Sequence, residues 1–198
     1  MSTREVAVGA YREALPVLAV SAAGGLFAGV VLGGMEAELR AIPGLLLVVP
    51  ALLAIRGNVY GSLGARLASA LHQGLVEPRV SLGDRRVRAA VAAAISNGLA
   101  MSLFAAIVGS FLVLLQGRAV SPLALIGVAL IAGLISGVVL TTAVVTVVFV
   151  GYRRGLDPDA LAGPVVTTTG DVVGLATMLF AARTVIALGL AGGGGGGA

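Results

Sequence analysis

The chain has 198 residues, of which 58% are hydrophobic and only 11% carry a charge. Soluble domains carry about 25% charged residues, so this composition excludes an ordinary soluble protein and indicates a chain that is largely surrounded by lipid. The formal net charge of +4 comes from arginines that lie between apolar runs, a pattern typical of membrane topology rather than of a nucleic-acid-binding face.

Five apolar stretches are long enough to cross a bilayer as helices, which takes about 20 residues each. In chain order they cover residues 15–32, 42 to beyond 60, 87–115, 122–150 and 165–190, and short loops join them. The predicted fold is therefore an all-α integral membrane bundle of five transmembrane helices. It occupies residues 15–191, between a cytoplasmic N-terminal segment of residues 1–14 and a flexible glycine tail of residues 192–198.

The arginines predict how this bundle is oriented, because basic residues near span ends prefer the cytoplasm. The arginines on the N-terminal side of the predicted membrane are Arg4, Arg12, Arg79, Arg85, Arg86, Arg88, Arg153 and Arg154, and those on the other side are Arg40, Arg118 and Arg183. This excess predicts that the N-terminus lies inside and the C-terminus outside, which agrees with an odd number of spans.

Asp171 is the one acidic residue within a predicted span. A charge in the hydrocarbon region is costly, and it usually faces a pore, a cavity or a partner. Thr167 and Thr168 come one turn before Asp171 and Gly174 almost one turn after it, so all four share one helix face. A polar face that bears a carboxylate predicts a site for a hydrated cation.

The second predicted span also carries polar residues, namely Arg56, Asn58, Tyr60 and Arg66. Asn58 can offer its amide oxygen to a cation, or it can join two helices through hydrogen bonds, and the sequence leaves both roles open. Asp171 likewise has two alternatives to ion binding. It can pair with Arg56 or Arg66, or it can be protonated and hydrogen-bonded.

Glycines mark the two polar segments. The sequences GNVYG at 57–61 and GDVVG at 170–174 each follow a proline, Pro50 or Pro164, by six or seven residues. Polar segments with glycine and proline in opposed spans point to a binding site near the membrane midplane. The pairs Gly57/Gly61 and Gly133/Gly137 are predicted to let helices approach closely.

Two acids precede the last span. Asp157 and Pro158 have the pattern of an N-cap and a first helical residue, and Asp159 follows in the first turn. Capping is the expected role of Asp157, and both acids can also gather cations at the cytoplasmic mouth of a pore.

The polar segments resemble a known family. Asp157-Pro158-Asp159, Pro164 and the run TTTGDVVG at 167–174 resemble the last helix of the MgtE-type magnesium transporter domain and of its eukaryotic solute-carrier relatives. Pro50, Gly57-Asn58 and the run RLAS at 66–69 resemble its second helix. The span number and the orientation agree as well, so the resemblance covers essentially the whole chain.

The resemblance implies a homodimer whose two copies enclose a pore on the two-fold axis, with the family's pore aspartate at Asp171. Magnesium keeps much of its water shell and prefers carboxylate and carbonyl oxygens. The expected ligands of Mg²⁺, or of Mn²⁺ or Co²⁺, are Asp171, Asn58, Thr167, Thr168 and the carbonyl groups near Gly170 and Gly174. The magnesium-sensing domain of bacterial members is expected to be absent, since residues 1–14 leave no room for it.

Other functions fit parts of the pattern. A proton- or sodium-coupled carrier of another small solute would use Asp171 as its coupling site, and a non-transporting membrane subunit would use the glycine-rich faces to bind a partner. An enzyme is not expected, because the sequence lacks a nucleophile–base set, a phosphate-binding loop and any cysteine, and has one histidine, His72. The expected partners are the transported ion, cell-membrane lipid and a second copy, with no resident cofactor and no nucleic acid.

Overall fold

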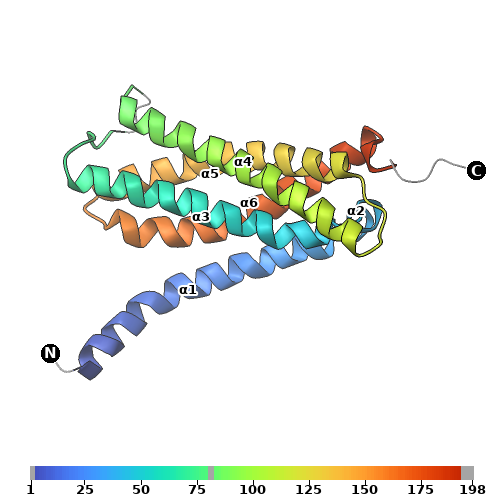
Figure 1. Ribbon diagram of the computed structural model, residues 1–198. Coiled ribbons are helices and arrows are strands. Elements are labelled where there is room, and N and C mark those ends of the chain that lie inside the picture. Colours follow the sequence, from blue (N-terminus) through green and yellow to red (C-terminus); the bar gives the residue numbers. More distant parts are fainter. Residues whose placement is uncertain (1–2, 80–82, 193–198) are drawn as a thin grey trace, which may run out of the picture.

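The computed structural model describes residues 3–79 and 83–192, and every regular element in that part is a helix. In chain order these are α1 (Thr3–Gly33), α2 (Glu36–Ala41), α3 (Leu45–His72), α4 (Arg85–Leu115), α5 (Pro122–Arg153), α6 (Pro158–Ala187) and the short 3-10 helix η1 (Leu190–Gly192). Helices α3 to α6 lie side by side as a bundle, and α1 runs obliquely along it with its first half turned away (Figure 1).

Four of these helices are long and apolar enough to cross a membrane: α3, α4, α5 and the part of α6 from Ala162 to Ala187. They correspond to the four predicted spans after the first and confirm them as helices. The apolar part of α1 within the described residues, Leu18–Gly33, is shorter. The fold is therefore a membrane helical bundle, and the fifth crossing, by α1, stays a prediction.

Local sequence signals account for where the helices begin. The Asp84 carboxylate accepts a hydrogen bond from the backbone N–H of Arg86 at 2.7 Å and caps α4. Ser121 caps α5 in the same way, and Pro122 is its first residue. Helix α6 begins at Pro158, as the Asp157-Pro158 pattern predicts.

The second predicted span begins later than expected. Gly44 adopts a φ of 89°, in the left-handed region that favours glycine, so the chain turns there and α3 starts at Leu45. The residues before this turn form α2, a helix of six residues that the hydropathy pattern did not indicate. Pro50 and Pro164 lie inside continuous helices rather than at breaks.

Helix α5 packs against three other long helices, α3, α4 and α6. Small residues line its buried face, and a methyl group added at Gly133 would lie 3.2 Å from the Ser102 hydroxyl of α4. Because lipid gives little hydrophobic drive between helices, such close approach supplies much of their packing. Large apolar side chains cover the outside instead, for example Leu26, Phe27 and Phe111.

The connections gather at two ends of the bundle. The N-terminus, the α3–α4 link and the α5–α6 link lie at one end, and α2, the α4–α5 link and the C-terminal end of α6 lie at the other (Figure 1). This separates the two groups of arginines as expected. Helix α1 begins at Thr3, so most of the predicted segment 1–14 is helical. The predicted glycine tail lies outside the described residues apart from Gly192.

Candidate ion site on helix α6

Asp171 lies in the middle of α6 and is half-buried. Within the described residues its carboxylate makes no hydrogen bond and no ion pair. In particular it does not pair with Arg56 or Arg66, the alternative that the sequence left open. A lone carboxylate at this depth is a position that a cation, a proton or a partner must satisfy.

The neighbours of α6 locate this carboxylate between two helices. A methyl group at Gly174 would lie 2.9 Å from Leu53 Cδ2 of α3, and the Thr168 hydroxyl donates a hydrogen bond to Ser21 Oγ of α1 at 3.3 Å. Asp171 is three residues from both Gly174 and Thr168, which is about 60° of helix rotation from each. It therefore lies on the strip of α6 between the lines of contact with α3 and α1.

The threonines before Asp171 are held by hydrogen bonds. The exposed Thr167 hydroxyl donates to the carbonyl oxygens of Gly163 at 2.9 Å and Pro164 at 3.2 Å. Thr168 bonds to Ser21, as described above. Each hydroxyl oxygen keeps lone pairs after its proton is used, so both remain possible oxygen ligands with fixed orientations.

Helices α3 and α6 run antiparallel, and two close contacts define their register. A methyl group at Gly64 would lie 2.9 Å from Ala162 Cβ, just as Leu53 meets Gly174. Because the helices are antiparallel, each residue forward along α3 corresponds to one residue back along α6. Counting from the Gly64–Ala162 contact places Asn58 level with residue 168, and counting from the Leu53–Gly174 contact places it level with residue 169. Asn58 is thus within about 4 Å of Asp171 along the bundle axis. It is exposed and has no described hydrogen-bond partner, and no contact joins it to Asp171.

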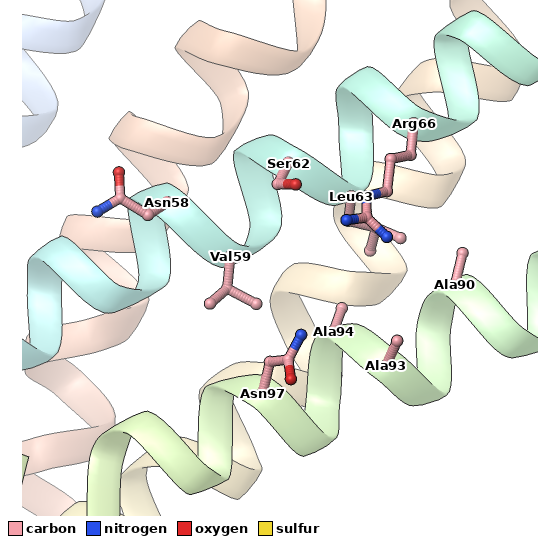
Figure 2. A pocket seen from close by; sticks show the side chains of 9 residues that line it. All are labelled: Asn58, Val59, Ser62, Leu63, Arg66, Ala90, Ala93, Ala94 and Asn97. Atoms are coloured by element: carbon pink, nitrogen blue, oxygen red, sulfur yellow. The ribbon is translucent and has the colours of Figure 1, made fainter. Parts of the chain in front are cut away.

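Asn58 also borders a groove of about 200 Å³ between α3 and α4, which is lined by both polar and apolar side chains (Figure 2). Ser62 and Arg66 line it from α3, and Asn97 extends toward it from α4, while the Asn58 side chain points away from α4. The sequence alone did not single out Asn97, because a lone asparagine in an apolar span gives no indication of which helix it faces.

Arg56 lies inside the bundle rather than on its surface. Its side chain is 4% exposed, and its Nε donates a hydrogen bond to Ser136 Oγ of α5 at 2.8 Å. Its Nη1 and Nη2 are buried and have no hydrogen-bond partner among the described residues. Ser136 and Ser21 carried no sequence signal, because single serines in spans commonly bond to their own helix.

The remaining predicted residues lie apart or serve other contacts. Gly170 is buried, with open space where a side chain would be, whereas Gly174 is covered by Leu53 and Arg56. Asp157 is exposed just before α6, about 20 Å along the helix from Asp171. Asp159 lies in the first turn of α6, and its side chain is outside the described part.

Within the described part of the chain, no three His, Cys, Asp or Glu side chains gather as a metal site. On the face of α6 described here, one copy therefore offers a single carboxylate, Asp171, and the hydroxyl groups of Thr167 and Thr168 one turn before it.

A family model described as MgtE, a divalent cation transporter, matches residues 49–181. This is two thirds of the chain and runs from α3 to α6, with both Asn58 and Asp171 inside it. The chain belongs to the MgtE family of divalent cation transporters. The MgtE match confirms the resemblance stated above, and it does not include α1. No curated protein matches the chain.

Membership of the MgtE family makes the chain a membrane protein of a divalent cation transporter family, which is not a family of enzymes. The match covers the same four helices that are long enough to span a membrane. The MgtE region thus coincides with the transmembrane bundle and with the strip that carries Asp171.

Proposed function

We propose that the chain transports Mg²⁺ or a related divalent cation through a pore between two copies, with Asp171 as the charged ligand. The observation that carries this proposal is the partnerless carboxylate in the middle of α6, within the part matched by a divalent cation transporter model. A cation supplies the countercharge that the chain itself does not provide there.

Charge balance favours a pair of chains. One Asp171 carboxylate neutralises half of a divalent ion, and two of them on a two-fold axis neutralise it completely. Asp171 lies on the strip of α6 between α1 and α3 and is half-buried rather than enclosed, so the exposed part of its side chain can face the same residue of a second copy. The homodimer and its axis rest on this argument and on the family resemblance.

Neutral oxygens complete the proposed site. Asn58 lies at a similar depth, and Thr167 and Thr168 precede Asp171 on its own helix. Gly170 is buried, but a methyl group added there would meet no other atom, whereas one at Gly174 would meet Leu53 and Arg56, so the backbone at Gly170 is the less crowded of the two proposed carbonyl ligands. Mg²⁺ keeps several waters in protein sites, so these groups need contact only its hydration shell.

The cytoplasmic mouth lies at the start of α6 in this proposal. Asp157 and Asp159 would raise the local concentration of divalent cations there, next to the arginine-rich links that the positive-inside rule assigns to the cytoplasm. The N-terminus is then inside, the C-terminus outside, and the cell membrane is the expected location.

Flux into liposomes tests the proposal. Purified wild type should carry Mg²⁺ into vesicles loaded with a magnesium indicator, and Asp171→Asn, which removes the charge and keeps the shape, should reduce that flux at least about tenfold. Glu36→Gln is the matched control, because Glu36 is an exposed acid paired with Arg40 away from the site. Full flux in a folded Asp171→Asn protein would remove Asp171 from the pathway. Proton or sodium movement in place of divalent flux would favour a coupled carrier.

A further inference from the structure

Arg56 is a buried cation that is only partly satisfied. Its side chain is 4% exposed in the middle of a membrane-spanning helix, and two of its three nitrogens lack partners among the described residues. Leaving a buried donor without a partner costs about 1–3 kcal/mol, and more when the group is charged. Buried charges in proteins are normally paired with an opposite charge, so an anion within reach would stabilise this guanidinium.

The nearest helix to the free end of Arg56 is α6, which carries Asp171. A methyl group at Gly174 would lie 3.0 Å from Arg56 Nη1, so the guanidinium rests directly on the α6 backbone. Asp171 is three residues before Gly174, and side chains at that spacing have Cβ atoms about 5–6 Å apart. The unpaired nitrogens therefore end about one helical turn from the unpaired carboxylate.

The register of α3 and α6 shows which way Arg56 would have to turn. Equal counting from the Leu53–Gly174 contact places Arg56 level with Asp171, and counting from Gly64–Ala162 places it level with Gly170. Side chains lean toward the N-terminus of their own helix. Because α3 and α6 are antiparallel, this lean takes the Arg56 side chain toward the C-terminal end of α6, that is, from the level of Asp171 to that of Gly174. Arg56 thus begins level with Asp171 and is held away from it.

Ser136 is the group that holds it there. The hydroxyl is fully buried, accepts the 2.8 Å hydrogen bond from Arg56 Nε, and donates its own proton to the Ala132 carbonyl of α5. Ser136 is neutral, so it compensates the guanidinium less than a carboxylate would. The described arrangement suits a state in which the carboxylate of Asp171 has another cation to bind.

We propose that Arg56 is a tethered cation that competes with the transported ion for Asp171. With a divalent ion at Asp171, repulsion keeps the guanidinium against Ser136, as the structure has it. When the ion leaves, the guanidinium of Arg56 moves along α6 by about the length of one helical turn, away from Gly174, and pairs with Asp171. This inference rests on the proposed role of Asp171, and it assigns Arg56 and Ser136 as positioning residues that set how tightly the ion binds.

The competition predicts opposite effects for the two residues. Arg56→Gln removes the competing charge, so Mg²⁺ should bind about tenfold more tightly, which corresponds to about 1.4 kcal/mol. Ser136→Ala removes the alternative partner of the guanidinium, so Arg56 should pair with Asp171 more often and weaken Mg²⁺ binding at least about threefold. In the double variant, without a guanidinium, the Ser136 effect should vanish.

Mg²⁺ titration of the purified protein, with binding followed by thermal unfolding in detergent, measures these affinities without requiring transport. Ser110→Ala is the matched control, since Ser110 is a buried serine of α4 that donates to its own helix at Ala106 and has no arginine partner. Its Kd should equal that of the wild type. A Ser136→Ala effect that depends on Arg56 supports the proposal.

Three outcomes would overturn it. An unchanged Kd in Ser136→Ala excludes the competition even if Arg56→Gln does not fold, because Ser136→Ala is a small change. A Ser136 effect that persists in the Arg56→Gln background assigns it to local packing. In both cases the proposed function stands if wild type binds Mg²⁺ and Asp171→Asn does not. If wild type binds no divalent ion, the proposed function fails and the inference fails with it.

Discussion

Tyr60 occupies a notch that two glycines leave open in the neighbouring helices. Its ring is 2% exposed, and its hydroxyl would lie 3.0 Å from a methyl group at Gly98 of α4 and 2.6 Å from one at Gly137 of α5. The Gly133/Gly137 pair therefore does bring helices together, as predicted. Gly57 and Gly61, in contrast, have open space beside them within the chain.

We expect Gly137→Ala to destabilise the bundle by about 1–3 kcal/mol, because the new methyl group overlaps the Tyr60 hydroxyl. Tyr60→Phe should restore most of that loss. The nearest ring carbon is then 3.7 Å away, an ordinary van der Waals distance. Thermal unfolding in detergent measures both variants, with Gly29→Ala as the control at an open helical position. A Gly137→Ala loss that Tyr60→Phe does not relieve would contradict this account.

A second residue-scale feature joins α2 to α6. The side chain of Glu38 is 8% exposed and accepts a hydrogen bond from Arg183 Nε at 2.8 Å. This hydrogen bond is the largest of the effects that lower the pKa of Glu38 below its ordinary value of 4.5. A lowered carboxylate pKa stabilises the fold above pH 4.5, and the contribution is lost as the pH falls through the pKa of the folded state.

Arg183→Ala should therefore cost about 1–3 kcal/mol at neutral pH, because it leaves a buried carboxylate whose Oε2 already lacks a partner. Glu38→Gln should flatten the decline in melting temperature as the pH falls below 4.5, where the wild type loses this contribution. Arg40→Ala is the control, since its pair with Glu36 is exposed and is worth at most about 0.5 kcal/mol. An acid decline that is identical in Glu38→Gln and wild type would contradict the assignment.

At the scale of whole helices, the sequence predicted more than at the scale of contacts. Long apolar runs at 87–115 and 122–150 located α4 and α5, and the Asp157-Pro158 pattern located the start of α6, because hydropathy and capping are local properties. The short α2 was missed, since six residues carry too little pattern. The partner of Arg56 was missed too, because Ser136 is 80 residues away and only the helix register brings them together.

Among the long helices α1 has the fewest neighbours, and α6 is its main contact. Helix α1 also lies outside the residues matched by the family model. Ser21 meets Thr168, and no side chain larger than hydrogen fits at Gly24, because its Cβ would overlap the methyl group of Thr168. This contact holds α1 beside the strip that carries Asp171.

Cysteine cross-linking tests this placement, and the chain has no native cysteine to interfere. The variant with Ser21→Cys and Thr168→Cys should form an intramolecular disulfide on mild oxidation, because the two hydroxyl oxygens are 3.3 Å apart. With a protease site inserted in the α3–α4 link, cleaved halves should stay joined until reduced. The control is Ala22→Cys with Thr168→Cys. Ala22 is the next residue after Ser21 on α1 and is exposed, so it points in a different direction from Ser21. Equal cross-linking of both pairs would mean that α1 is not fixed on α6.

For the whole molecule, Asp171 could be predicted as a candidate site from the sequence, since it is a single acid in an apolar span. The sequence could not establish that Arg56 leaves it unpaired, because this depends on the register of α3 and α6 and on the hydrogen bond to Ser136. The half-buried position of Asp171 and the open sides of Gly57 and Gly61 likewise depend on how the helices pack within one copy.

The membrane orientation connects these scales, because it decides which end of the Asp171 strip faces the cytoplasm. If the arginine-rich end is cytoplasmic, Gln116→Cys at the end of α4 should react with a membrane-impermeant maleimide on intact cells. Gln73→Cys at the end of α3 should react only after permeabilisation. Both positions are exposed, and they lie at opposite ends of the bundle (Figure 1). The reverse pattern would invert the proposed topology and place Asp157 outside.

The same labelling decides whether α1 is the fifth crossing. Val8 is 45% exposed in the first half of α1, at the end of the bundle where Gln73 lies. A helix that crosses places Val8→Cys inside with Gln73→Cys, so both should stay unlabelled in intact cells. If α1 instead lies on the extracellular surface of the membrane, Val8→Cys should be labelled in intact cells together with Gln116→Cys. The protein would then cross the membrane four times, with both termini on the same side. The cytoplasmic end of the bundle would be formed by α3, α4, α5 and α6 without α1.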